Sequence, residues 1–234
     1  MLLEVCIDHP ESVLAAAAGG ADRLEVCANL AEGGTTPPVS LVEFAHARTG
    51  LPLMMMIRPR GGSFCYTEAE WDLIRRDLQQ ARSLPLQGVV LGMLTSARRI
   101  DAERLREALD LAGPLEVTFH RAFDLVQEPE AGLELLLRLG VKRLLTSGQA
   151  PKAPDGAALI RRLCLLAGDA LAVMAGSGVE PGNVRQLAAD TGVREVHASG
   201  RVRQGGTAQD AFDTSWHATD AARVRAIKTA LAGL

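Results

Sequence analysis

The feature that most constrains the fold is an eightfold alternation of short apolar runs with helical stretches across 234 residues. Each apolar run is followed by a loop, and each stretch after it is rich in Ala, Leu and Arg. The average is about 29 residues per unit, the length that a strand–helix–strand unit needs. Strict alternation of strands and helices indicates a parallel sheet covered by helices.

The expected strands are residues 2–7, 23–27, 53–58, 88–93, 115–120, 142–147, 171–176 and 194–199, and the expected helices lie near 10–19, 39–49, 67–83, 101–112, 128–139, 155–167, 180–190 and 219–232. Thr67 stands three residues before Glu70, which predicts a capping box at one helix start. Pro129 near the start and Gly140 just past the end mark another helix.

Right-handed connections leave two arrangements for such a chain, an open doubly wound sheet or a closed barrel. Eight units in this length favour a (βα)8 TIM-type barrel, an α/β fold. No Gly/Ser-rich or Pro-rich linker divides the chain, so residues 1–234 are predicted to form a single domain. Residues 201–217 are expected to be a long loop after the eighth strand.

Composition excludes several classes of protein. Aromatic residues are only 3% and the formal net charge is −3, so base stacking and phosphate-backbone binding by a nucleic-acid protein are not expected. No apolar run approaches the roughly 20 residues of a membrane span, and no basic signal region opens the sequence, so we expect a cytoplasmic protein. The four cysteines form no CxxC pair and are expected to be free thiols.

In a barrel of this type the site lies at the carboxyl ends of the strands. Side chains alternate in and out along a strand, and in five strands the polar set is expected to point inward. These sets are Glu4, Cys6, Asp8; Glu25, Cys27, Asn29; Met54, Met56, Arg58; Glu116, Thr118, His120; and Glu195, His197, Ser199. Buried carboxylates need partners, and strand order makes Arg58 the expected partner of Glu4 and Glu25.

Acid/base chemistry is one interpretation of this set. Glu4 and Glu25 are then the acid/base candidates and His120 a proton shuttle, because the ordinary pKa of histidine lies near neutrality. The loops after strands 7 and 8 hold residue types that bind anions through backbone N–H groups, although ordinary tight turns also use them. The predicted ligand-binding residues are Arg58, Arg60, Asp124, Gly176, Ser177, Gly178, His197 and Ser199.

Metal binding is a second interpretation. Cu(I) prefers thiolate and thioether ligands. Cys6 and Cys27 are expected at matching positions on adjacent strands, which lie about 4.8 Å apart, so their sulfurs could meet at one ion. Cysteine is also among the most commonly buried residues, so inert core thiols remain an alternative.

Six segments together resemble the CutC family, long named for copper homeostasis. They are LEVCIDHPESVLAAAAGGADRLEVCANLAEGGTTPP, IRPRGGSFCYTEAE, GPLEVTFHRAFD, RLLTSGQ, VMAGSGV and REVHASG. The resemblance implies a cytoplasmic TIM-type barrel that forms a homo-oligomer, a dimer or tetramer, with Cys6 and Cys27 as copper ligands. Residues 201–217 depart from the family pattern.

Three functions follow as hypotheses. The first is Cu(I) binding at Cys6 and Cys27 in copper homeostasis. The second is an enzyme that acts on a small anionic or sugar-like molecule with inward carboxylates, His120 and Arg58. The third is a polar core with a purely structural role, in which internal ion pairs fill the barrel.

Overall fold

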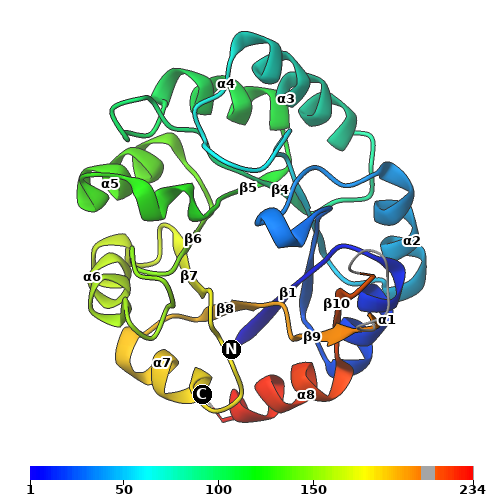
Figure 1. The fold of residues 1–234 in the computed structure, drawn as a ribbon. Coiled ribbons are helices and arrows are strands. Elements are labelled where there is room, and N and C mark those ends of the chain that lie inside the picture. Colours follow the sequence, from blue (N-terminus) through cyan, green and yellow to red (C-terminus); the bar gives the residue numbers. More distant parts are fainter. Residues whose placement is uncertain (207–213, 234) are drawn as a thin grey trace.

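A closed barrel of eight parallel strands forms the centre of the computed structural model, which describes residues 1–206 and 214–233 (Figure 1). The strands follow chain order, and β8 closes the barrel against β1. The predicted (βα)8 TIM-type barrel is therefore confirmed. The strands are β1 (Leu2–Ile7), β2 (Arg23–Val26), β3 (Leu53–Met56), β4 (Gly88–Leu91), β5 (Glu116–Phe119), β6 (Arg143–Thr146), β7 (Ala172–Gly176) and β8 (Glu195–Ala198).

Helices surround this barrel on the outside (Figure 1). Two short 3-10 helical turns, Leu30–Glu32 and Arg121–Leu125, lie in the loops after β2 and β5. The helices are α1 (Pro10–Gly19), α2 (Val39–Thr49), α3 (Glu68–Ala81), α4 (Ala102–Ala112), α5 (Pro129–Leu139), α6 (Ala157–Ala167), α7 (Val184–Thr191) and α8 (Ala221–Ala230).

Local sequence signals explain where several helices begin and end. Thr67 and Glu70 form the predicted capping box at the start of α3, each side chain accepting a hydrogen bond from the other residue's backbone N–H. Pro129 occupies the first turn of α5. Gly140 ends that helix with φ +78°, a left-handed conformation that glycine adopts without steric cost.

The apolar core lies between the barrel and its helices. In β1 the outward residues Leu3, Val5 and Ile7 are fully buried, as the alternation of side chains predicts. Trp71 of α3 is also fully buried, and its indole N–H donates to Glu107 of α4 at 2.9 Å. The residues of β1 between these outward positions, Glu4 and Cys6, point into the barrel, where the site lies.

Residues 201–217 differ from the expected long loop. β9 (Arg201–Gln204) and β10 (Trp216–Thr219) pair antiparallel, so that expectation is wrong for these two segments, while 207–213 lies outside the described residues. The pair is anchored to helix α1, because Thr219 is buried and its backbone N–H donates to Ser12 Oγ at 2.9 Å. Burial requires backbone N–H groups such as that of Thr219 to be hydrogen-bonded, so β10 is ordered although the composition of the segment is typical of a loop.

None of the described helices is both long and apolar enough to cross a membrane. The structure holds one chain, so the expected dimer or tetramer stays a prediction.

Candidate functional site

A cavity of about 650 Å³ opens at the carboxyl ends of the barrel strands. Its volume falls within the range typical of small-molecule sites. Several predicted site residues line it, and they come from positions spread along the whole sequence. These are Cys6, Glu25, Arg58, His120, Asp124, Ser177, Gly178, His197 and Ser199.

A network of charged side chains fills the barrel on the amino-terminal side of this cavity. Arg23 of β2 pairs with Glu4 of β1 and, at 2.6 Å, with Glu195 of β8. Arg143 of β6 extends the network, lying 2.6 Å from the same Glu195 oxygen and 3.2 Å from Glu116. Arg23 and Glu4 are almost inaccessible to solvent. The predicted ion pairing inside the barrel is therefore present, but its cations are Arg23 and Arg143.

Glu4 consequently belongs to the barrel interior below the cavity. Its Oε2 accepts from Arg23, and it is absent from the residues that line the cavity. Its Oε1 lies 3.9 Å from His197 Nε2, so it adds negative charge beneath that histidine. The structure thus places Glu4 as a buried partner of Arg23, and an acid/base role for it stays a prediction.

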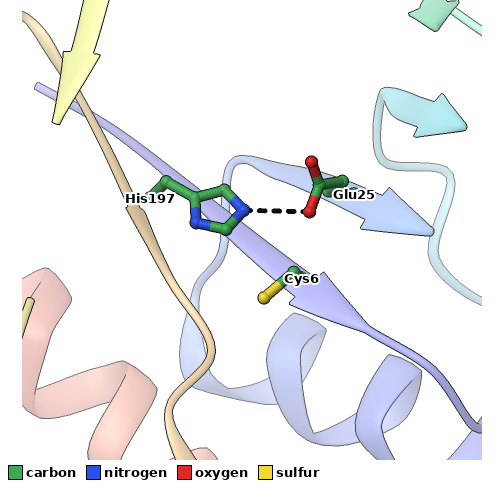
Figure 2. Close-up of side chains that lie close together, drawn as sticks. All are labelled: Cys6, Glu25 and His197. Carbon is green, nitrogen blue, oxygen red and sulfur yellow. Dashed lines mark hydrogen bonds and ion pairs between the residues drawn. The ribbon is translucent and has the colours of Figure 1, made fainter. Parts of the chain in front are cut away.

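Glu25, His197 and Cys6 form the cluster at the base of the cavity (Figure 2). His197 Nε2 lies 3.0 Å from Glu25 Oε2, and one ligand atom from each of the three residues lies within 4.8 Å of the others. Burial opposes charge on both partners, but their mutual attraction and hydrogen bond outweigh it. The pKa of Glu25 is therefore lowered, and the pKa of His197, which Cys6 also raises, lies well above its ordinary value.

Cys27 does not lie opposite Cys6; it lies two residues beyond Glu25, the residue that does. The strand register places Cys6 opposite Glu25, so the expectation that Cys6 and Cys27 occupy matching positions is wrong. Parallel pairing is offset along the chain, and a small shift in register changes which side chains face each other. The Cys27 thiol is fully buried and donates to Glu25 Oε2 at 3.5 Å. Burial and the Glu25 carboxylate raise the pKa of this thiol well above its ordinary value.

His120, which follows β5, presents one ring nitrogen that has no partner among the described residues. Its Nδ1 accepts a hydrogen bond from the backbone N–H of Ala122 at 3.2 Å, so Nε2 carries the proton of the neutral ring. Burial and the nearby Arg58 guanidinium lower the pKa of His120 to about 4. The ring packs against Phe64 with centroids 4.9 Å apart. A Cβ on Gly92 would lie 2.4 Å from His120 Nδ1, so the ring needs glycine at that position.

Arg58 does not pair with Glu4 or Glu25, which corrects the partner expected from strand order. Its guanidinium donates instead to the backbone carbonyls of Glu32, Gly34 and Gly62 at 2.9–3.0 Å. It lies over the Phe64 ring, 4.7 Å from the centroid, and is 4% exposed. Among the residues that the structure describes, no carboxylate oxygen lies within 4.0 Å of it. The cavity wall therefore holds a buried cation with no carboxylate partner in the described part of the chain.

Arg60 and Gly176 lie outside the described lining of the cavity. The Arg60 guanidinium pairs with Glu70 at 2.5 Å and donates to nearby loop carbonyls, so it organises the loop after β3. Gly176 permits close packing, because a Cβ there would lie 2.5 Å from Leu145 Cδ1.

Asp124 lines the cavity, but its carboxylate is occupied by other parts of the protein. It accepts hydrogen bonds from Thr146 Oγ1 at 2.5 Å, from Ser147 through both N–H and hydroxyl, and from the Gln149 N–H. Arg121 Nε donates to it as well, at 2.8 Å. Asp124 therefore holds the loop after β6 in place.

The loops after β7 and β8 bring Ser177, Gly178 and Ser199 to the same rim of the cavity. Ser177 has φ +83°, and its hydroxyl donates to the Pro151 carbonyl at 2.9 Å. These are the residue types and the position that the anion-site prediction requires, and the prediction stays open.

Arg23 and Arg143, the cations of the charged network below the cavity, were not predicted from the sequence. Both stand at the first residue of a strand, outside the inward sets that the sequence predicts. Arg23 shares the alternation of Glu25 and Cys27, so the period-two argument could have found it. Arg201 of β9 and Arg223 of α8 also line the cavity and were not predicted, because neither segment carries a motif.

Comparisons with known proteins agree on one family. The family model described as CutC family matches residues 1–202. A protein of Chromobacterium violaceum named as a family protein CutC is 47% identical over 98% of both chains. A human relative named copper homeostasis protein cutC homolog is 42% identical over 86% of this chain and 73% of its own. A crystal structure of CutC from Streptococcus agalactiae matches with TM-score 0.80 and 31% identity, covering 84% of this chain and 97% of that one.

Proposed function

Because this chain belongs to the CutC family, we propose that it acts in copper homeostasis and binds Cu(I) at Cys6 and His197. The observation that carries this proposal is the cluster of thiol, imidazole and carboxylate within 4.8 Å. Thiolate is the ligand type that Cu(I) prefers, and imidazole also binds copper. The name of the human relative supports copper as the cargo. The four described thiols are free, as expected for the reducing cytoplasm to which we assign this activity.

The donor set fits Cu(I) better at Cys6 than at Cys27. A carboxylate is a hard ligand, so we assign Glu25 to orienting His197 through its hydrogen bond at 3.0 Å. Cys27 is fully buried and its thiol already donates to Glu25. We therefore propose that Cys6 and His197 hold the ion and that Cys27 supports the carboxylate.

Replacing Cys6 tests this ligand assignment. We expect Cys6→Ser to weaken Cu(I) binding at least about tenfold, about 1.4 kcal/mol, because a hydroxyl is a poor ligand for Cu(I). Cys27→Ser is the matched control and is expected to change the affinity much less. Affinities would be measured by competition of reduced protein with a Cu(I) chelator. Equal losses in both variants would favour the paired-thiol hypothesis instead.

The proposed site also predicts how pH changes Cu(I) affinity. Cys6 and Glu25 raise the pKa of His197 well above its ordinary value, so the imidazole holds its proton more tightly and copper has to displace that proton. Affinity should therefore rise with pH through the region above the ordinary histidine value, by up to about tenfold per pH unit for each proton displaced. Competition titrations between pH 6 and 9 measure this. Glu25→Gln removes the carboxylate that stabilises the imidazolium, so its profile should flatten; an unchanged slope would contradict the role of His197.

Arg58 favours a second candidate function, an enzyme that binds a small anionic molecule in the cavity. Its buried guanidinium has no described carboxylate within 4.0 Å, and the cavity of about 650 Å³ is large enough for such a ligand. A buried cation without a counter-ion attracts an anion strongly, because the surrounding dielectric is low. Ser177, Gly178 and Ser199 lie on the same rim.

Replacing Arg58 tests this second candidate with a neighbouring control. We expect Arg58→Met to weaken binding of ribose 5-phosphate or inorganic phosphate about 10- to 100-fold, about 1.4–2.8 kcal/mol, the scale of charge-assisted hydrogen bonds. Arg60→Met removes a guanidinium two residues away that is absent from the cavity lining, and it should leave the affinity unchanged. Isothermal titration calorimetry measures both. If neither anion binds the wild-type chain, the anion site is wrong.

A further inference from the structure

Three residues lining the cavity each carry a buried polar atom without a protein partner in the described part of the chain. They are Glu25 Oε1, His120 Nε2 and Arg58 Nε. Buried polar groups are almost always hydrogen-bonded, so orphaned atoms grouped in one cavity point to a ligand that would satisfy them. One atom is a carboxylate acceptor, one a neutral donor and one a charged donor, so together they restrict the chemistry of the ligand.

His120 contributes a hydrogen-bond donor that carries no charge. The N–H of Ala122 occupies Nδ1 as an acceptor, which places the ring proton on Nε2. The aromatic ring of Phe64 lies against one side, and the Arg58 cation nearby disfavours a second positive charge on the imidazole. A neutral imidazole that donates from Nε2 can polarise a carbonyl oxygen and stabilise the negative charge that develops on it.

Glu25 contributes a proton acceptor. Its Oε2 faces the donors of His197 and Cys27, at 3.0 and 3.5 Å, whereas Oε1 has no donor among the described residues. Glu25 lies on β2 and His120 follows β5, so the acceptor and the donor approach the cavity from well-separated strands of the barrel. A small molecule between them would meet a carboxylate on one side and an N–H on the other.

Arg58 adds a fixed positive charge to this pair. Three backbone carbonyls hold the guanidinium, and Nε is left without an acceptor. A carboxylate base with a neutral histidine donor is a known arrangement for removing a proton next to a carbonyl group. A nearby cation favours substrates that also carry an anionic group.

We propose that the cavity catalyses enolisation of a small anionic α-hydroxy aldehyde or ketone, an inference that rests on the second candidate function above. The C–H bond next to the carbonyl breaks, its proton moves to Glu25 Oε1, and its electron pair forms the C=C bond of an enediolate. The negative charge on the former carbonyl oxygen is stabilised by His120 Nε2–H and Arg58. When the proton on Glu25 is replaced by a solvent deuteron, its return to the same carbon gives exchange with solvent. Its return to the neighbouring carbon, together with transfer of the substrate hydroxyl proton to the former carbonyl oxygen, gives the isomer. No oxidant or reductant is required.

Deuterium exchange tests this proposal. The metal-free full chain would be incubated in D₂O with dihydroxyacetone phosphate and, separately, with hydroxypyruvate, and loss of the α-proton signal would be followed by NMR. We expect exchange above the buffer rate with at least one probe. Glu25→Gln should reduce this rate at least about 100-fold, and His120→Gln about 10²- to 10³-fold. Cys65→Ser, which changes an exposed residue outside the described cavity lining, should keep the wild-type rate.

Two measurements separate failure of this inference from failure of the binding proposal. Circular dichroism of each variant shows whether it is folded, and His120→Gln provides a second test if Glu25→Gln is not. Calorimetry with the same two probes measures binding independently of chemistry. Binding that depends on Arg58 without any exchange would overturn enolisation alone, whereas absence of both would overturn enolisation and the anion site together. Exchange that survives in folded Glu25→Gln also overturns the proposal.

Discussion

Arg23→Met is expected to lower the free energy of unfolding by about 3–5 kcal/mol, the scale of breaking a buried ion pair. Arg23 is 2% exposed and bridges Glu4 and Glu195 inside the barrel. Removing the guanidinium leaves the fully buried Glu4 carboxylate without its cation, and burial of an unpaired charge is very costly. Urea unfolding at pH 7 measures the effect.

A surface ion pair provides the control for this loss. Arg194 pairs with Asp169 at 2.8 Å, but the two side chains are 83% and 84% exposed. Water and salt screen such pairs, so Arg194→Met should change the stability by less than about 1 kcal/mol. If the two variants were equally stable, the charged network in the barrel would contribute little, and the structural role assigned to it would be wrong.

Asp124→Ala is expected to cost about 2–4 kcal/mol of stability. The substitution removes the acceptor for Thr146 and Ser147, both fully buried, and each unsatisfied buried donor costs about 1–3 kcal/mol. Thermal and urea unfolding measure the change. Asp155→Ala removes an exposed carboxylate from the same loop and should be nearly neutral.

This comparison also separates two roles for Asp124. The sequence predicts a ligand-binding residue, whereas the structure shows a carboxylate saturated by loop donors. If Asp124→Ala were as stable as Asp155→Ala but failed to bind ribose 5-phosphate, the ligand role would be favoured.

The periodicity of the sequence was sufficient to predict the barrel, because strand and helix periods are local properties of the chain. The predicted strand at 23–27 and the observed β2 (Arg23–Val26) differ by one residue. The inward direction of Glu25 and His120 also followed from alternation, and both residues line the cavity.

Which side chains contact each other inside the barrel could not be predicted in the same way. It depends on register and on how far a long side chain reaches across the barrel, and neither is encoded in spacing along the chain. Cys6 therefore lies opposite Glu25, and Arg58 binds loop carbonyls. The β9–β10 pair was missed because the segment RVRQ has no apolar alternation, and its anchor at Ser12 lies about 200 residues away.

The charged network determines by which route a small molecule can enter and leave the cavity. Because Arg23, Arg143 and their carboxylate partners occupy the barrel interior below the cavity, the cavity is a dead end with its opening at the strand carboxyl ends. A molecule that enters has to leave by the same route, so release of one molecule must precede entry of the next. Arg201 and Arg223 line the same cavity, where a bound anion would obstruct entry and release equally.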